Sequence, residues 1–287
     1  MREEILISVV VPIYRGEKYI EAIESMVVQN ASLFETNPGI ELIFVNDYPS
    51  NPLPIEEKWD RGVKIRVVEN ERNVGIHQSR IHGLTHAQGE YILFLDQDDR
   101  ISNDCLFSQL SAIGQADMVV ANGYKEKDGE MKKIYRSTKK QALVLDPTIY
   151  QKAANQIVSP GQCLIRKSAI PAEWKERVIV QNGGDDLFLW FLMFTNQAKI
   201  VLNENCVYTH VETGSNTSND LQQMILSAEN VISILKDCPR VPLNMWKAYQ
   251  KRISFLKEKE SRKGMARLFV HFRYLDICVY KLYAYYR

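Results

Sequence analysis

The sequence predicts an α/β fold in which an open, mostly parallel β-sheet is flanked by helices and followed by a helical C-terminal extension. Over the first hundred residues, short apolar runs rich in β-branched side chains alternate with segments of helical periodicity. Such alternation indicates crossover connections and therefore parallel neighbouring strands. The runs have no polar face, as expected of strands that are covered on both sides. From about Leu221 onward the pattern is helical and increasingly basic.

The elements of the first half follow from these patterns. Ile5–Val11 is an apolar strand that Pro12 ends, and Glu17–Gln29 carries its apolar side chains on one helical face. The other expected elements are strands at Glu41–Val45, Val63–Val68 and Tyr91–Leu95 and a helix at Gly75–Ala87. Ligands of open parallel sheets bind beyond the carboxyl ends of the strands, so the residues that directly follow these strands are site candidates.

The pattern changes after Val120. Asn122–Arg136 predicts a hairpin that turns at Asp128-Gly129. Leu187–Phe194 predicts an apolar helix with two acids at its start. Short strands are expected at Cys163–Ile165, Ile200–Leu202 and Val207–Val211.

Composition excludes several classes of protein. The chain has 287 residues, a net charge of +1 and 45% hydrophobic residues, which argues against disorder, collagen-like repeats and a disulfide-stapled scaffold. A net charge near zero gives no reason to expect nucleic-acid binding. The five cysteines are far apart and contain no C-x-x-C, which is typical of reduced thiols in the cytoplasm.

The sequence also lacks signals for export or membrane spanning. The start, Met1–Glu4, is acidic, unlike the basic start of a signal peptide. No uncharged stretch approaches the roughly 20 residues that a spanning helix needs. We therefore expect a cytoplasmic protein, either soluble or attached peripherally to the inner face of the cell membrane.

Three carboxylates gather directly after one buried strand, in Asp96-Gln97-Asp98-Asp99. Like charges at such a place repel unless a cation or solvent relieves them. Mg²⁺ and Mn²⁺ prefer oxygen ligands, and a metal held here would stabilise a nucleotide diphosphate as a leaving group. The alternative interpretation is an acidic helix start, with Asp99 or Ser102 capping a helix that begins near Asn103.

Further motifs occur in a characteristic order along the chain. They are Val9-Val10-Val11-Pro12-Ile13-Tyr14, Val45-Asn46-Asp47, Asn73-Val74-Gly75 and Gly89–Asp99, followed by Ser159-Pro160-Gly161, Gly184-Asp185-Asp186, Tyr208-Thr209-His210 and Gly214-Ser215-Asn216. With these motifs the chain resembles inverting family-2 glycosyltransferases of the bacterial polysaccharide type, which have the Rossmann-like GT-A fold. The resemblance spans roughly residues 5 to 220 and is more specific in its first half.

The resemblance implies a hexosyl- or N-acetylhexosaminyltransferase of cell-surface polysaccharide or glycan synthesis. It would move a sugar from a nucleotide-sugar donor, typically UDP-linked, to a saccharide or lipid-linked saccharide, with Mn²⁺ or Mg²⁺ as cofactor. It also implies a transferase domain at 1–220, with a donor half at 1–120 and an acceptor half at 121–220, and an extension at 221–287. The alternative is a catalytically inactive nucleotide-sugar-binding or scaffolding protein with the same fold.

The resemblance further implies roles for individual residues. The donor-binding residues would be Pro12, Tyr14, Asp47, Asn73, Arg80 and Asp96, and the metal ligands would be Asp98 and His210. Asp47 would bind the base, its alternative being an Asx-turn. Arg80 would reach a phosphate or the Asp96 carboxylate, its alternative being a solvated surface residue. Relatives commonly carry A-R-N where this chain has Ser79-Arg80-Ile81, so no asparagine contact is expected there.

The catalytic residues implied by the resemblance are Asp186 as general base and Asp185 as its neighbour that orients the acceptor or loop. Their alternative role is to favour the start of a helix through its dipole. A neutral imidazole is a sound ligand for a divalent metal, and the alternative for His210 is a structural histidine.

Two basic segments are candidates for contacts with partners of the protein. Tyr124–Lys140 holds seven Lys or Arg against three acids, and we expect a solvated hairpin more than a contact to an anionic acceptor or membrane. Ser261–Arg287 combines six Lys or Arg and seven aromatic residues with one acid. This pattern is typical of an interfacial helix on an anionic membrane. A helix packed on the catalytic domain or in a homodimer interface is the alternative that the sequence leaves open.

Overall fold

The structure is a computed structural model that describes residues 5–34, 39–214 and 220–287. It consists of two compact units, each described here by itself. The sheet unit contains residues up to 135 together with 158–170 and 198–215, and the helical unit contains 136–157, 171–197 and the residues from 216 onward. These units interleave along the chain, and the domain boundary at residue 220 stays a prediction. The acidic start Met1–Glu4 and the Ser215-Asn216 part of one motif lie outside the described residues.

One sheet forms the frame of the sheet unit. Its strands are β1 (Ile7–Ile13), β2 (Ile40–Asn46), β3 (Lys58–Asp60), β4 (Val63–Glu69), β5 (Tyr91–Phe94), β6 (Arg100–Ile101), β7 (Met118–Lys127), β8 (Glu130–Lys133), β9 (Cys163–Arg166) and β10 (Ile200–Val211). The order is β3-β4-β2-β1-β5-β9-β7-β10-β6, with β8 paired to β7. The block β4-β2-β1-β5 is parallel, whereas β9 runs antiparallel to both of its neighbours. The predicted fold class is confirmed, with a sheet that is mixed beyond β5.

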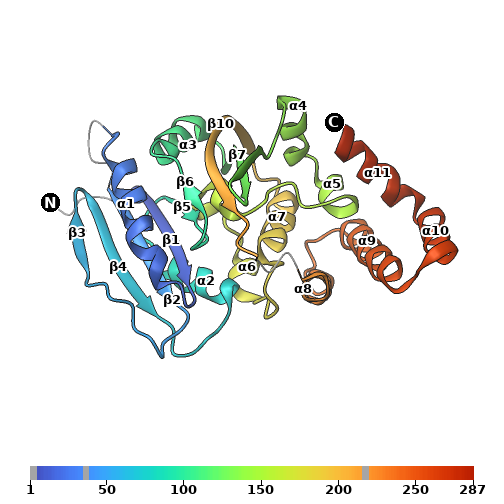
Figure 1. Ribbon diagram of the computed structural model, residues 1–287, viewed down its shortest axis with the longest axis horizontal. Coiled ribbons are helices and arrows are strands. Elements are labelled where there is room, and N and C mark those ends of the chain that lie inside the picture. The colour runs from blue at the N-terminus through green and yellow to red at the C-terminus, as the bar shows by residue number, and fades with distance from the viewer. Residues whose placement is uncertain (1–4, 35–38, 215–219) are drawn as a thin grey trace. The chain divides into compact units, whose positions relative to one another are not determined.

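Helices cover both faces of the parallel block (Figure 1). On one face α1 (Ile20–Ala31) and α3 (Cys105–Ile113) share a core with the inward side chains of β1, such as Val9 and Val11. On the other face lies α2 (Ile76–His86), in which a Cβ added to Gly83 would lie 2.3 Å from Val10 Cγ1. Burial of apolar strands between these two layers explains why the strand sequences have no polar face.

Three sequence-based boundaries were wrong. Pro12 does not end β1, because it pairs with Val45 in register and its missing N–H points toward β5, which has already ended at Phe94. The two expected strands after residue 200 are one strand, β10, which shifts its register against β7 between Asn203 and Tyr208. The first turn of the helix expected at Glu17 is a 3₁₀ helix.

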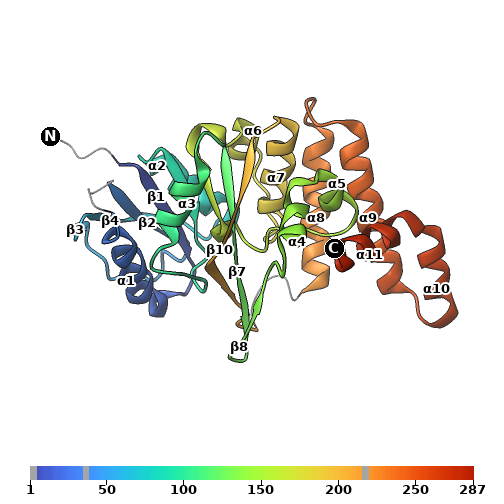
Figure 2. The same cartoon turned by 90° about the horizontal axis from the view of Figure 1, so that it is seen from above.

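The hairpin expected at Asn122–Arg136 is confirmed. β7 and β8 are antiparallel, and the turn between them falls on Asp128 and Gly129, both with positive φ. Figure 2 shows this ribbon extending past the neighbouring strands of the sheet. Several of its charged side chains form exposed ion pairs, among them Lys132 with Glu130, which agrees with a solvated hairpin.

The helical unit contains the remaining helices among the described residues. These are α4 (Thr138–Gln141), α5 (Pro147–Lys152), α6 (Ala172–Glu176), α7 (Asp185–Thr195), α8 (Leu221–Lys236), α9 (Leu243–Ser261), α10 (Gly264–Arg273) and α11 (Leu275–Tyr286). A 3₁₀ helix at Ala142–Leu145 also lies in this unit, and two others, at Pro160–Gln162 and Lys167–Ala169, lie in the sheet unit. The basic C-terminal segment is therefore two helices that meet at Tyr274 rather than one. In the part of the chain that the structure describes, no helix is long and apolar enough to cross a membrane.

The close approach of α2 to the sheet generates a test. We expect Gly83→Ala to destabilise the protein by about 1–3 kcal/mol, because the added methyl group overpacks against Val10 and Val45. The gain in helix propensity, about 1 kcal/mol, is too small to offset this cost. Urea unfolding measures the difference, with Thr85→Ala on the exposed side of α2 as control, for which a change within about 0.5 kcal/mol is expected. Equal stability of the two variants would contradict this packing.

Candidate active site

Asp47 ties the carboxyl end of β2 to the start of α2. Its Oδ1 accepts hydrogen bonds from the Val74 N–H at 2.8 Å and the Asn70 side-chain amide at 2.9 Å, and its Oδ2 accepts one from the Gly75 N–H at 3.0 Å. The side chain is only 4% exposed. The Asx-turn considered for Asp47 is made instead by Asn46, whose Oδ1 accepts from the Tyr48 N–H at 3.0 Å. Asp47 is thus fixed, with its backbone at the sheet edge where ligands of this architecture bind.

An aromatic and cationic surface lies beside Asp47. Tyr14 is 43% exposed, and its ring meets that of Tyr48 edge to face at 5.6 Å. The Arg15 guanidinium lies 4.8 Å from the centre of the Tyr48 ring and 5.5 Å from that of Tyr14. Such a surface can bind a planar, polar ring by stacking and cation–π contact.

The other two donor-side candidates near this surface are placed differently. Pro12 is buried within β1. Asn73 is exposed, and its Oδ1 accepts the Gly75 N–H at 3.1 Å, so it supports the same loop as Asp47. The contact that the structure shows for the Asn73 side chain is therefore with the backbone at the start of α2.

Gln97 joins the loop after β1 to the loop after β5. Its Oε1 accepts the Tyr14 N–H at 2.9 Å, and its Nε2 donates to the Tyr14 carbonyl at 3.3 Å. Gly16 makes room for this side chain, because a Cβ at Gly16 would lie 2.2 Å from Gln97 Oε1. The sequence analysis gave Gln97 no role of its own between Asp96 and Asp98, so this contact was not predicted.

Asp96 is held by two protein groups. Arg80 of α2 forms an ion pair with its Oδ1, and Ser159 donates a hydrogen bond to its Oδ2 at 2.9 Å. Arg80 is 3% exposed, so the interpretation as a solvated surface residue was wrong, and of its two expected partners the structure shows the Asp96 carboxylate. The ion pair between buried Arg80 and half-buried Asp96 fixes the orientation of Asp96 at the carboxyl end of β5.

Asp99 is buried and anchors three groups of β10. It accepts hydrogen bonds from the Tyr208 hydroxyl, from His210 Nδ1 at 3.0 Å and from the Val211 N–H at 3.0 Å. Gly161 makes room for Tyr208, because a Cβ there would lie 2.7 Å from the ring. The helix-capping alternative for Asp99 was wrong, since α3 begins at Cys105 after Asp104.

Two acids of this strand end, Asp98 and Asp99, have raised pKa values. Burial, followed by the charges of Asp99 and Asp96, raises the pKa of Asp98 to about 6. Burial also raises the pKa of Asp99, although the hydrogen bond from His210 opposes the shift. Burial lowers the pKa of His210, but the hydrogen bond and charge of Asp99 outweigh burial and the net shift is upward. Positive charge is therefore favoured at this place.

The donor set beside Asp98 fits a divalent cation. Because Asp99 accepts from Nδ1 of His210, the Nε2 atom of that ring is the one left to act as a ligand, which is the usual arrangement of metal-bound histidines. Among the described residues, no group of three or more His, Cys, Asp or Glu side chains forms a metal site. Asp98 and His210 are the side chains here that would hold such a cation.

The acidic pair of the helical unit starts α7. Asp186 is half-buried, and its Oδ2 accepts a hydrogen bond from the Asn155 side-chain amide at 2.8 Å. Its Oδ1 accepts from the Leu187 N–H at 2.6 Å, as expected of an acid in a first helical turn. Asp185 is buried, and its carbonyl accepts the Trp174 indole N–H at 2.9 Å. Asp186 is the more accessible of the two carboxylates, and Asn155, which the sequence did not single out, orients it.

Comparison with known proteins identifies relatives of this chain. Residues 8–172 match the family model described as "Glycosyl transferase family 2". An uncharacterized glycosyltransferase of Haemophilus influenzae is 32% identical over 141 residues, which are 47% of this chain and about half, 54%, of that relative. Glycosyltransferase GlyG of Streptococcus pneumoniae is 27% identical over 95% of this chain and 94% of its own length. The minor teichoic acid biosynthesis protein GgaB of Bacillus subtilis is 39% identical over 33% of this chain and 10% of its own.

Solved structures show the same fold at lower identity. TarS 1-349 of S. aureus in complex with UDP aligns with a TM-score of 0.61 and 18% identity over 89% of this chain and 72% of that chain. The complex of TarS 1-349 with UDP-GlcNAc aligns with a TM-score of 0.59 and 19% identity over 98% of this chain and 89% of that chain. The fold that the sequence motifs implied is therefore confirmed.

The contacts of Asp47 generate a test of what holds the loop before α2. We expect Asp47→Ala to lower the free energy of unfolding by about 1–3 kcal/mol, because the Val74 N–H loses its acceptor and the Gly75 N–H keeps only the weaker contact to Asn73 Oδ1. Asp47→Asn keeps one side-chain oxygen and should cost less. Urea unfolding of both variants measures the effect, and wild-type stability of Asp47→Ala would show that these hydrogen bonds do not stabilise the fold.

Proposed function

The chain belongs to glycosyl transferase family 2, and from this premise we propose that it transfers a sugar from a UDP-linked donor to a saccharide or lipid-linked saccharide, with inversion. The observation that carries the proposal is the strand end Asp96-Gln97-Asp98-Asp99. Two of its acids are fixed by Arg80, Ser159 and β10, which leaves Asp98 beside a histidine oriented for ligation. A site that binds an anionic diphosphate through a cation needs this combination.

The donor base has a fitting surface after β1 and β2. In our proposal the base lies against the Tyr14 and Tyr48 rings, and Asp47 contributes the hydrogen-bond acceptor with its remaining lone pairs. Gln97 holds the backbone of this loop against the acidic strand end, which keeps the base pocket and the diphosphate pocket in one arrangement. The two similar TarS structures are complexes with UDP and UDP-GlcNAc, which supports a uridine donor.

The cation site is proposed at Asp98 and His210. When bound, Mn²⁺ or Mg²⁺ would neutralise charge on the departing diphosphate. The part played by the protein is to hold the ligands in place: Asp99 fixes the His210 ring, and Tyr208 fixes Asp99. Arg80 neutralises Asp96, so that the charge on that acid does not repel the diphosphate.

Asp186 is proposed as the general base. Its carboxylate accepts the proton of the acceptor hydroxyl while that oxygen forms a bond to the anomeric carbon of the sugar. The bond from the anomeric carbon to the diphosphate oxygen breaks in the same step, and UDP leaves with that electron pair. Asn155 holds one carboxylate oxygen of Asp186, and buried Asp185, whose carbonyl accepts the Trp174 indole N–H, is proposed to orient the acceptor or its loop.

The product class is proposed from the relatives. GgaB is named as a teichoic acid biosynthesis protein, which supports an acceptor that belongs to a cell-surface polysaccharide. The alternative class, a protein that binds nucleotide sugar without transfer, is distinguished by UDP release. Binding of UDP-sugar together with no UDP release for any acceptor would favour it.

The donor and cation sites are tested by thermal shift. We expect one UDP-sugar to raise the melting temperature in the presence of Mn²⁺, and Asp98→Ala to lose both the metal-dependent part of the shift and at least about a hundredfold in UDP release. Glu71→Ala, an exposed acid in the loop after β4, is the control that should behave as wild type. No shift with any nucleotide sugar, or normal metal-dependent turnover by Asp98→Ala, would refute the proposed site.

The base is tested by a change that keeps shape and removes charge. Asp186→Asn should lower the rate of transfer by about 10²–10⁴-fold, since the amide cannot accept the proton. Donor binding in the thermal-shift assay should remain that of the wild type, and so should the activity of Asp237→Asn, an exposed acid at the end of α8. Transfer by Asp186→Asn at the wild-type rate would exclude Asp186 as the base.

A further inference from the structure

The helix α10 turns its apolar side outward. Met265, Leu268, Phe269 and Phe272 follow the i, i+3, i+4, i+7 spacing of one helical face, and all four are exposed, with Phe269 and Phe272 at 66% and 67%. In a globular protein this face normally packs on the core. Here Val270, on another side of the helix, makes the inward contact. The regular apolar face of α10 is thus left facing solvent.

The next helix repeats the arrangement. Leu275, Val279, Leu282 and Tyr286 of α11 share one face and are exposed. Ile277 enters the same buried cluster as Val270, with Phe255 of α9, so both helices direct their apolar faces away from α9. Ala284 packs against α5 through the cluster of Leu143, Ile149 and Ala153. We call the eight exposed side chains of the two helices the apolar stripe.

Positive charge accompanies the apolar stripe. Residues 262–287 contain six Lys or Arg and one acid, Asp276. That acid is already paired with Lys251 of α9 at 2.8 Å. The uncompensated charge of the segment is therefore positive and lies beside exposed aromatic side chains, the combination that binds the headgroup region of anionic membranes.

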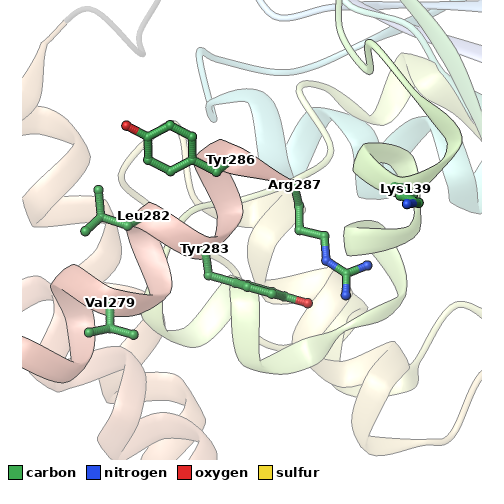
Figure 3. A pocket seen from close by; sticks show the side chains of 6 residues that line it. All are labelled: Lys139, Val279, Leu282, Tyr283, Tyr286 and Arg287. Atoms are coloured by element: carbon green, nitrogen blue, oxygen red, sulfur yellow. The ribbon is translucent and has the colours of Figure 1, made fainter.

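A hollow of about 690 Å³ borders the α11 part of the stripe (Figure 3). Its lining residues are Lys139, Val279, Leu282, Tyr283, Tyr286 and Arg287. Figure 3 shows Lys139 and Arg287 extending toward the same space from α4 and the end of α11. The lining residues include two cationic side chains and no acidic side chain, so the hollow would attract an anionic group.

We propose that the apolar stripe binds the surface of an anionic lipid bilayer, with lipid phosphates at the Lys139–Arg287 hollow. The helices are 10 and 12 residues long, too short to span a bilayer, so they lie in the interface. A second copy of the chain is the less suitable occupant, because a symmetric interface would bring two like-charged stripes together. The stripe and the donor site share no residue, so membrane binding and donor binding can be measured separately.

Vesicle co-sedimentation of the full chain tests the proposal. Vesicles with equal parts of phosphatidylglycerol and phosphatidylcholine should bind the protein, and vesicles of phosphatidylcholine alone should bind it at least about tenfold more weakly. High salt should weaken the binding, because the charges are exposed. The double variants Phe269→Ser/Phe272→Ser and Lys139→Glu/Arg287→Glu should each reduce binding by about tenfold or more.

Matched controls replace exposed apolar or basic side chains elsewhere on the surface by the same residue types, Ser or Glu. Trp59→Ser/Met131→Ser and Lys175→Glu/Lys199→Glu should bind anionic vesicles as the wild type does. All variants should keep wild-type melting temperatures and donor-induced thermal shifts, which separates this proposal from the proposed function. No binding to anionic vesicles, or equal losses in the controls, would overturn it. Light scattering that shows a dimer which Phe269→Ser/Phe272→Ser converts to monomer would assign the stripe to a second copy instead.

Discussion

The need to compensate three carboxylates at the end of β5 organises the sheet unit. Arg80 reaches Asp96 from α2, which is held in place by Asp47, and Ser159 reaches it from the segment before β9. Asp99 draws the Tyr208 hydroxyl and the His210 ring of β10 to the same place. Elements that are distant in sequence thus meet because buried negative charge must be paired or hydrogen-bonded. The raised pKa of Asp98 indicates that this compensation is incomplete at that acid.

The sequence could predict the features that depend on neighbouring residues. The strands β1, β2, β4 and β5 are apolar throughout, and the turn at Asp128-Gly129 has the residues that positive φ favours, so these elements were confirmed. The three acids after β5 were predicted from their position at a strand end. The contacts that orient them depend on pairs such as Asp99 with His210, which are 111 residues apart and follow no local pattern.

Periodicity also leaves the direction of a helical face undetermined. The spacing of Met265, Leu268, Phe269 and Phe272 is the same whether the face is covered or open, and the sequence therefore left membrane, partner and domain packing as alternatives. The structure shows which side of these helices packs on the protein, because Val270, Tyr274 and Ile277 share a buried cluster with Phe255. The role of Asn155 in the helical unit was equally unpredictable. Its contact with Asp186 depends on the fold, and no sequence pattern marks a single asparagine as the partner of an acid 31 residues away.

The irregular register of β10 makes chain length in this strand a determinant of the site. Between Asn203 and Tyr208 the strand contains residues that have no counterpart in β7, and Tyr208 and His210 share a strand face because they are two positions apart. A single insertion or deletion within this irregular segment that shifts the following residues by one position would turn both side chains to the opposite face of the sheet. A change of length in this strand alone would therefore remove the His210 side of the proposed cation site, while every acid of the Asp96–Asp99 segment is retained.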